Sequence, residues 1–357
     1  MLPVLGALCL GIVLEYKLEW LDKFQTYLNQ TAVLPVSPTS FNARSGEKLG
    51  SLEPLPLEPV AKGHWREEAR SRILKQIRGS LAPSSAVTYR IEFEIKHDDL
   101  AEKRLTIASF DGQLIPATLF APVKQVGALP AVLVVPGHTR SGESGLLQLS
   151  EIDSSYQHAA ARKIAEAGFV TLAFELRGFG YLGEPQFPEH KAVAYNALQR
   201  GESYKSLILK DAAVAMALLR ALPQVDAVRT GITGASYGGE IAVQYAALDP
   251  QVAAVSFHSF GGRAGKVKPV TSGNDLPHFC HLFPAVDGWM HIEHWFWLLA
   301  PRPTHGIRGL SNQRGFVESH ELYARGWDRP EDLKLQVESG GHEFFVEAAI
   351  AFFKSRL

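Results

Sequence analysis

The sequence predicts an α/β domain in which a mostly parallel sheet is flanked by helices, with a helical and extended segment at the N-terminus. Three observations support this fold class. From Leu129 onward, short apolar runs typical of buried strands alternate with helical patterns, as a parallel sheet covered on both faces requires. A serine flanked by glycines, Ser236, stands between one such strand and one such helix. A loop histidine, His342, follows the last predicted strand.

The composition limits the classes of function. The chain has 357 residues, of which 36 are lysine or arginine and 37 are aspartate or glutamate, without a basic block. Nothing therefore favours a nucleic-acid partner. The cysteines, Cys9 and Cys280, are too few for a disulfide framework, and the 13 histidines form no pair at the spacing of a metal-binding motif. We therefore expect no metal and no cofactor.

Residues 1–63 form the predicted N-terminal segment. An apolar run, residues 2–14, and a helix, residues 14–28, lead into a proline-rich connector, residues 32–63. The apolar run lacks a basic flank and is shorter than a membrane-spanning helix usually is. Two interpretations stay open: a membrane anchor or signal, and a helix that packs on the domain or on a partner subunit. The first interpretation implies membrane contact through residues 2–14, and the second allows oligomer formation. The compartment is undecided between an extracytoplasmic or membrane-anchored location and the cytoplasm.

The folded domain is predicted to span residues 64–357. It begins with an amphipathic helix over residues 65–81, which Gly79 and Pro83 end. Alternating apolar residues and the hairpin turn at Asp111-Gly112 then predict three antiparallel strands, residues 89–95, 104–109 and 114–121.

The first parallel strand, residues 130–135, ends in the tight turn Pro136-Gly137-His138-Thr139. Backbone amides at His138 or Thr139 could donate hydrogen bonds to an oxyanion. Later in the chain, Arg177 follows the next strand; it either lines the site or, as is commoner in such turns, bonds backbone carbonyls. The remaining elements before the serine are a helix at 154–167, a strand at 169–174 and a helix at 205–222.

The stretch Gly234-Ala-Ser-Tyr-Gly238 predicts a sharp turn between a strand and a helix, with Ser236 at its apex. Small residues two positions before and after the serine are needed because strand and helix nearly touch there. The backbone N–H of Tyr237, at the start of the helix, would point where an oxyanion forms. The alternative is an ordinary glycine-rich loop.

Three more strands are predicted after the serine, at 252–257, before Arg308 and at 333–337, with a final helix at 344–353. His258, just past a strand end, is expected to line a pocket. The segment 261–299 is rich in aromatic residues and histidine. It predicts either a lid or pocket wall for a partly apolar substrate, or a packed helix over 289–299.

The order of these parts, a serine at a strand-to-helix turn followed by a histidine near the C-terminus, resembles the α/β-hydrolase superfamily. It is similar to the dienelactone hydrolase and acetyl xylan esterase-like branch in five features: the helix at Trp65-Arg66, Asp111-Gly112, Arg177-Gly-Phe-Gly180, Ala300-Pro-Arg-Pro303 and Gly341-His342. The resemblance implies a serine hydrolase that acts on a small-molecule ester or acylated substrate, with Ser236 as nucleophile and His342 as general base.

The sequence departs from the family where the third member of the triad is expected. The loop after Ala-Pro-Arg-Pro and its strand carries Asn312 and Gln313 in place of a carboxylate. Three accounts stay open. Glu318, one turn further on, is slightly preferred as the acid; Asp275 or Asp287 from the preceding segment could replace it; or Asn312 orients the histidine without a charge.

Three functional hypotheses result. The first is an esterase that works through an acyl-enzyme. The second keeps the fold and cleaves carbon–carbon bonds of diketone-like substrates, as some relatives with an N-terminal helical segment do. The third is a catalytically impaired protein that binds without turnover.

Overall fold

The computed structural model describes residues 62–77, 81, 86–97, 99–124, 126–140, 143–183, 190–262, 279–313 and 315–357. These residues belong to one compact unit, Glu53–Leu357. Most of the predicted N-terminal segment, with the apolar run at 2–14, lies outside the described residues. No helix in the described part of the chain is long and apolar enough to cross a membrane.

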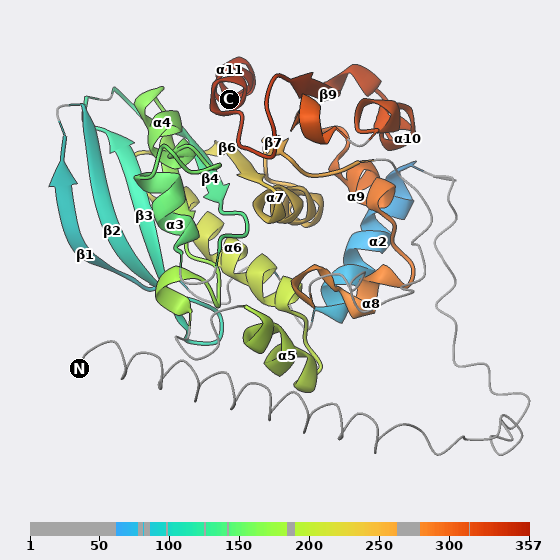
Figure 1. Ribbon diagram of the computed structural model, residues 1–357, viewed down its shortest axis with the longest axis horizontal. Helices are drawn as coiled ribbons and strands as arrows, with labels where there is room; N and C mark the ends of the chain where they lie inside the picture. Colours follow the sequence, from blue (N-terminus) through green and yellow to red (C-terminus); the bar gives the residue numbers. More distant parts are fainter. Residues whose placement is uncertain are drawn as a thin grey trace, which may run out of the picture. The chain divides into compact units, whose positions relative to one another are not determined.

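A nine-stranded mixed sheet forms the centre of the domain (Figure 1), in the order β1-β2-β3-β5-β4-β6-β7-β8-β9. The first three strands are antiparallel, as predicted, and β3 is also antiparallel to β5. The other neighbours are parallel. The strands are β1 Tyr89–Lys96, β2 Leu100–Ala108, β3 Leu114–Pro122, β4 Leu129–Val135, β5 Val170–Phe174, β6 Val225–Ala235, β7 Ala254–His258, β8 Thr304–Gly309 and β9 Leu333–Glu338.

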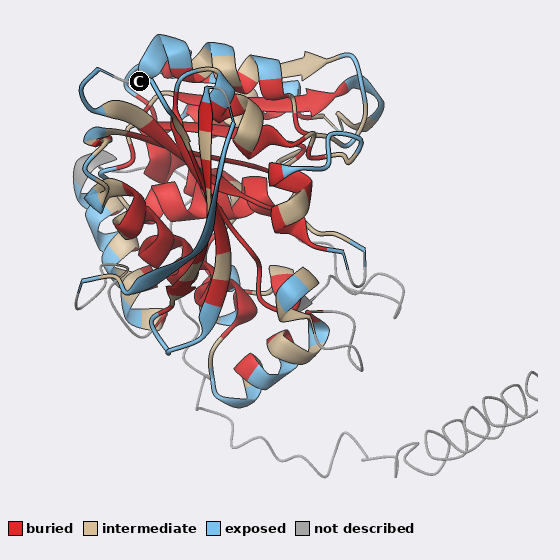
Figure 2. Cartoon of the chain, turned by 90° about the vertical axis from the view of Figure 1, so that its left-hand side faces the viewer, coloured by how far each residue is buried: buried red, intermediate tan, exposed pale blue. Residues whose placement is uncertain are grey.

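Helices cover both faces of the central strands. On β4, Ala131, Leu133 and Val135 face α6 (Tyr204–Ala221) and α7 (Tyr237–Leu248), and α2 (Lys62–Gln76) and α9 (Ile292–Leu299) pack on α7 in the same core. The alternate residues, Val132 and Val134, pack with α3 (Gly145–Ser150), α4 (Ala160–Glu166) and α11 (Val346–Arg356). Side chains of a strand alternate between its faces, so the uninterrupted apolar runs follow from burial on both sides. Figure 2 shows the resulting buried centre and the exposed edges.

The remaining helices are short. They are α5 Lys191–Gln199, α8 Pro284–Asp287 and α10 His320–Ala324, with 3-10 turns η1 Gly180–Leu182, η3 Phe279–His281, η4 Leu310–Asn312, η5 Val317–Ser319 and η6 Pro330–Asp332. The helix predicted over 154–167 is wrong at its start, because α4 begins only at Ala160. His158 and Ala159 have φ angles of 51° and 49°, and this left-handed backbone cannot be part of an α-helix.

Strand β1 forms one edge of the sheet and is exposed along its whole length. Its alternating pattern is typical of a strand with one buried face, yet Tyr89, Ile91, Phe93 and Ile95 are 40–54% exposed. The edge strand extends beyond the helices that cover the centre of the sheet (Figure 1). The apolar row of β1 is therefore outside the core.

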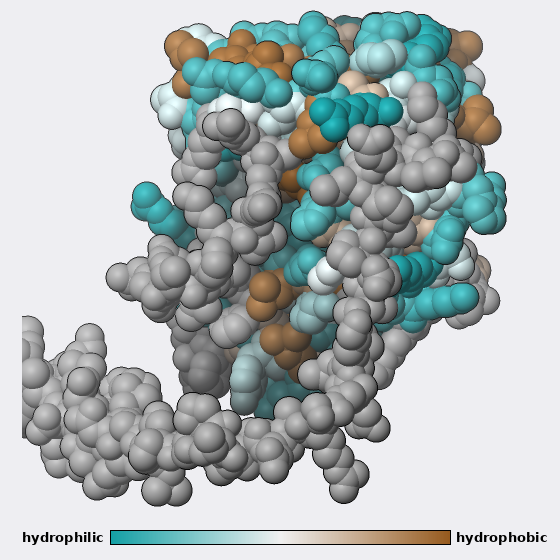
Figure 3. All heavy atoms as spheres, turned by 90° about the vertical axis from the view of Figure 1, so that its right-hand side faces the viewer, coloured by the Kyte–Doolittle hydropathy of each residue, from teal (hydrophilic) through white to brown (hydrophobic). Residues whose placement is uncertain are grey.

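The aromatic segment before β8 is packed into the domain where it is described. Trp289, Phe296 and Trp297 are fully buried, and α9 lies against α7 and α2. This is what the packed-helix alternative requires; residues 263–278 of the segment lie outside the described residues. Figure 3 views the side of the domain that carries α2, α8 and α9, where hydrophilic and hydrophobic residues are interspersed.

Two buried histidines predict that the domain loses stability at mildly acidic pH. Burial lowers the pKa of His294 and of His305 to about 4. In the unfolded chain each imidazole takes up a proton near pH 6.5, so between these values the unfolded state binds more protons. The free energy of unfolding should therefore fall as the pH is lowered from 6.5 to 4, by up to roughly 3 kcal/mol for each histidine.

Urea denaturation between pH 7 and pH 4 measures this effect. His305→Gln should reduce the slope of the free energy of unfolding against pH relative to the wild type. Equal slopes in the two proteins would contradict the assignment.

Candidate active site

Ser236 lies at the carboxyl end of β6, where the chain turns into α7. Its backbone has φ 58° and ψ −121°, a conformation that side-chain-bearing residues rarely adopt. The Ser236 N–H donates to the carbonyl of His258 at 2.8 Å, which fixes the turn against β7. Between Thr230 and Leu248, Ser236 is the one residue that is not buried. The turn thus exposes this hydroxyl at the edge of an otherwise closed core.

The two glycines around Ser236 are required by close packing. A Cβ atom on Gly238 would lie 2.1 Å from the carbonyl oxygen of Val135, and one on Gly234 would lie 2.4 Å from the carbonyl carbon of Gly238. Both separations are far below van der Waals contact. The sequence argument for a strand-to-helix turn with a serine at its apex agrees with this geometry.

The turn after β4 passes close to Ser236. The Gly137 N–H donates to Gln157 Oε1 at 2.8 Å, and the hydroxyl of Tyr156 donates to the carbonyl of His138 at 2.8 Å. Thr139 Oγ1 donates to the carbonyl of Glu143 at 2.8 Å. These contacts tie the turn to residues 143–157, and the His138 ring also stacks on that of Tyr237, the first residue of α7. The predicted oxyanion donors at His138, Thr139 and Tyr237 are therefore neighbours.

His342 lies in the loop after β9, and Asn312 lies at the end of η4 after β8. Asn312 Nδ2 is 2.9 Å from His342 Nδ1. The two loops touch: Ser311 donates from both its N–H and its hydroxyl to the carbonyl of Gly340, and a Cβ on Gly309 would lie 2.1 Å from the carbonyl oxygen of Gly341. This contact explains why the side chain at position 312 reaches the histidine.

Two of the three carboxylates predicted as the third member, Glu318 and Asp287, are placed elsewhere. Glu318 is exposed on η5. Asp287 accepts a hydrogen bond from the N–H of Phe283 at 2.7 Å and so belongs to α8. Asp275 lies outside the described residues. The geometry therefore favours Asn312 over the slightly preferred Glu318.

The prediction that His258 lines a pocket is wrong. His258 is 0% exposed, and its ring stacks on Phe344 with centroids 4.2 Å apart. Along β7 its side chain points to the same face as Ala254, the face that α11 covers. Burial lowers the pKa of His258 well below its ordinary value, and the imidazole stays neutral. Its contribution to the turn is its backbone carbonyl.

The prediction that Arg177 lines the site is also wrong. Arg177 Nε and Nη2 donate to Asp211 at 2.7 Å each, and Nη1 and Nη2 donate to Asp111 at 2.6 and 2.9 Å. Both carboxylates are bound through two oxygens, which is the geometry that suits a guanidinium. Burial alone would lower the pKa of Arg177, but these hydrogen bonds raise it above its ordinary value. Arg177 joins the hairpin turn, the loop after β5 and α6, and its partners are carboxylates rather than backbone carbonyls.

Removal of this buried cation should destabilise the domain strongly. Arg177→Ala leaves Asp211, whose side chain is 1% exposed, without its partner, so we expect a loss of about 3–5 kcal/mol in the free energy of unfolding. Urea denaturation measures the loss. Lys124→Ala, which breaks an ion pair with Asp99 in which both side chains are more than four-fifths exposed, is the control and should have almost no effect. A similar result for both variants would contradict the role given to Arg177.

The sequence did not indicate Ser259, which holds the histidine loop. Its hydroxyl donates to the carbonyl of Glu343 at 2.9 Å and accepts from the N–H of Glu343 at 3.0 Å. Ser259 has φ 52°, so the chain leaves β7 through a strained residue to make this contact. Glu343 in turn contacts His158 at 3.0 Å. The sequence signal that could have indicated Ser259 was its position directly after β7, the strand that pairs with β6.

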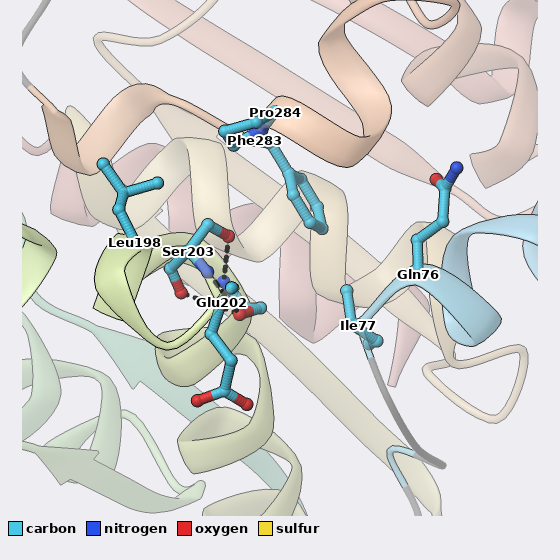
Figure 4. Close-up of a pocket in the computed structure, with 9 residues that line it drawn as sticks. Gln76, Ile77, Leu198, Glu202, Ser203, Phe283 and Pro284 are labelled. Carbon is cyan, nitrogen blue, oxygen red and sulfur yellow. Dashed lines mark hydrogen bonds between the residues drawn. The ribbon is translucent and has the colours of Figure 1, made fainter. Parts of the chain in front are cut away.

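A pocket of about 220 Å³ lies between α2, the start of α6 and α8 (Figure 4), away from these residues. It is lined by Gln76, Ile77, Leu198, Gly201, Glu202, Ser203, Ser206, Phe283 and Pro284. None of the predicted site residues lines it. The candidate active site is therefore the loop edge of the sheet around Ser236, not this pocket.

Comparisons with known proteins agree with the fold. Residues 85–260 match the family model of acetyl xylan esterase. No curated protein sequence matches the chain. A solved structure assigned as an acetyl xylan esterase, from Bacteroides fragilis, has a TM-score of 0.66 at 15% identity and covers 79% of this chain and 76% of its own.

Two further solved structures are similar. A glucuronoyl esterase from Solibacter usitatus has a TM-score of 0.59 at 14% identity, with 81% of this chain and 91% of that chain covered. A CE15 glucuronoyl esterase from Teredinibacter turnerae has a TM-score of 0.57 at 15% identity, with 83% and 85% covered. At these identities the structures establish the shared fold, which confirms the predicted fold class.

Proposed function

We propose that this chain is an ester hydrolase of the α/β-hydrolase superfamily that cleaves carboxylic esters through an acyl-enzyme on Ser236. The observation that carries the proposal is the backbone of Ser236, with φ 58° and ψ −121° between β6 and α7. The turn is strained and is enclosed by glycines that close packing requires. Such a turn has a clear use when the half-buried serine hydroxyl must reach a substrate.

In this proposal His342 is the general base. A serine hydroxyl is a weak nucleophile until an imidazole takes its proton during attack on the ester carbonyl. The same imidazole then gives the proton to the departing alkoxide, and a water molecule activated in the same way releases the acid. His342 follows β9 at the carboxyl edge of the sheet, the edge at which β6 delivers Ser236.

Asn312 orients the imidazole. The structure has Asn312 Nδ2 at 2.9 Å from His342 Nδ1; with the amide turned over, its oxygen would accept from Nδ1–H and leave Nε2 unprotonated and able to accept the serine proton. An amide lacks the negative charge that stabilises the imidazolium formed during attack. We therefore infer a slower enzyme than one with a carboxylate at this position.

The oxyanion of the tetrahedral intermediate is assigned to two backbone donors. One is the N–H of Tyr237, the first residue of the 12-residue helix α7, where the helix dipole adds to the stabilisation. The other is an amide of the His138-Thr139 turn, which the hydrogen bond from Tyr156 to the His138 carbonyl fixes in place. Preorganised donors of this kind contribute about 10²–10³-fold each to the rate.

The substrate is a small-molecule ester. The family match to acetyl xylan esterase supports an acetylated carbohydrate as the substrate class, and the glucuronoyl esterase structures support esters of a sugar acid as the next candidate.

Intact-mass labelling with a fluorophosphonate, together with hydrolysis of a short-chain aryl ester, an acetylated sugar and a methyl glucuronate, tests the proposal. We expect one phosphonate adduct at Ser236 and turnover of the acetyl esters. Cleavage of a β-diketone without ester turnover would establish the carbon–carbon hydrolase instead. A folded protein that neither labels nor turns over any ester would be the impaired binding protein. No described feature favours either alternative.

A further inference from the structure

We propose that His138, Cys280 and His281 form a binding site for a thiophilic divalent cation, with Zn²⁺ as the best match. One ligand atom from each of the three side chains lies within 4.8 Å of the others, and His138 Nε2 is 3.1 Å from Cys280 Sγ. The site is separate from the proposed ester chemistry, which uses the backbone of His138 rather than its ring.

The donor set suits zinc. Imidazole nitrogen and thiolate sulfur are the ligands that Zn²⁺ prefers, and three of them leave the fourth tetrahedral position for water. Bond lengths of about 2.0–2.1 Å to nitrogen and about 2.3 Å to sulfur separate tetrahedral ligand atoms by about 3.3–3.6 Å. Side-chain shifts of roughly 1 Å would bring the three observed atoms to these separations.

A carboxylate already orients one of the three ligands. His281 Nδ1 is 2.6 Å from Glu240 Oε2. A carboxylate on one ring nitrogen directs the other nitrogen to a metal and raises its basicity, and this arrangement recurs behind metal-bound histidines. Glu240 is buried and is itself fixed by Lys205, whose Nζ also donates to the backbone carbonyl of His281 at 2.9 Å. The lysine charge is thus paired with that of Glu240.

The ring of His138 is held rigidly by its neighbours. It stacks on Tyr237 and on His190, with centroid separations of 4.6 and 4.8 Å. Cys280 is 0% exposed, whereas His138 and His281 are half-buried. The cluster therefore has an enclosed sulfur side and a partly open imidazole side through which a cation can enter.

The sequence predicted no metal because the ligands are not arranged as a motif. His138 lies in the turn after β4, and Cys280 and His281 lie 142 and more residues later, in η3. Only the packing of η3 against α6 and the turn brings them together. A bound cation would link the turn after β4 to η3, two segments that do not belong to the same secondary-structure element.

Titration of the chelator-treated, full-length protein tests the site. Zn²⁺ binding is followed by calorimetry, and Co²⁺ binding by absorbance, because a thiolate ligand gives a charge-transfer band in the near ultraviolet and a tetrahedral site gives intense visible bands. We expect one cation per chain and a higher melting temperature with Zn²⁺. Cys280→Ser should abolish the charge-transfer band and weaken Zn²⁺ binding about 100-fold or more. Loss of a group that only hydrogen-bonds to a ligand lowers metal affinity about 10–100-fold, and loss of a ligand itself should lower the affinity at least as much.

Matched variants separate this site from other causes. Cys9→Ser removes the other cysteine and should bind both cations as the wild type does. His281→Gln keeps the thiol and should also weaken Zn²⁺ binding, which provides a second test if Cys280→Ser does not fold by circular dichroism. Absence of stoichiometric binding by the wild type, or a wild-type Co²⁺ spectrum in Cys280→Ser, would overturn the proposal and leave a hydrogen-bonded thiol–imidazole pair. Ester turnover is not a readout here, so the two proposals fail independently.

Discussion

Replacement of Ser236 by alanine is expected to lower kcat for ester hydrolysis by about 10⁴-fold or more and to abolish fluorophosphonate labelling. The loss is large because the variant lacks the oxygen that forms the acyl-enzyme, while the oxyanion donors and substrate contacts remain. The melting temperature should change little, since the half-buried hydroxyl is replaced in an unchanged turn. Steady-state hydrolysis of an aryl acetate and intact mass measure the two effects.

Ser355→Ala is the control for this variant. Its hydroxyl donates to the backbone carbonyl of Phe352 on the exposed side of α11 and has no part in the proposed mechanism. It should label and turn over as the wild type does. Retention of more than a few per cent of the activity in Ser236→Ala would contradict the covalent mechanism.

Asn312→Asp is expected to raise kcat about tenfold or more and to move the acid limb of the pH profile of kcat/KM to higher pH. The carboxylate stabilises the imidazolium that forms during attack, which raises kcat. It also favours the protonated imidazole in the free enzyme, so the base becomes neutral only at a higher pH. Asn312→Ala removes the orienting contact at 2.9 Å and should lower kcat about tenfold with little change in KM.

Gln313→Asp places the same new charge one residue further along the loop and is the matched control. Its pH profile should stay as in the wild type. If Asn312→Asp leaves both kcat and the acid limb unchanged, Asn312 is not the orienting residue, and Asp275, outside the described residues, becomes the next candidate for the acid.

The strand pattern and the Ser236 turn were predictable because their causes are local. A continuous apolar run predicts a strand covered on both faces wherever it stands in the chain. Gly234 and Gly238 are each separated from Ser236 by one residue. The residues that satisfy the steric requirement of the turn therefore lie within five consecutive positions. The position of His342 followed from its place after the last strand.

The partners of the site residues were not predictable, because contacts between distant loops decide them. Asn312 reaches His342 since Gly309 lets the loops after β8 and β9 touch, and nothing in either loop alone shows that contact. Glu318 had the better chemistry for the acid but is exposed on η5. The carboxylate partners of Arg177 lie 66 residues before it and 34 residues after it, so the sequence did not show these ion pairs. Arg177 was therefore assigned to the site.

The exposed edge strand β1 has a consequence for solubility. In the described part of the chain β1 pairs with β2 alone, so its outer backbone groups and its apolar row would together form a template for pairing with other chains, which is how edge strands promote aggregation. The residues between the apolar ones are all charged: Arg90, Glu92, Glu94 and Lys96. Arg90 contacts Glu92, and Glu94 is 3.6 Å from Lys103 on β2. A pairing chain would have to desolvate this charged row, so the same alternation that predicted the strand also protects the edge that the fold leaves open.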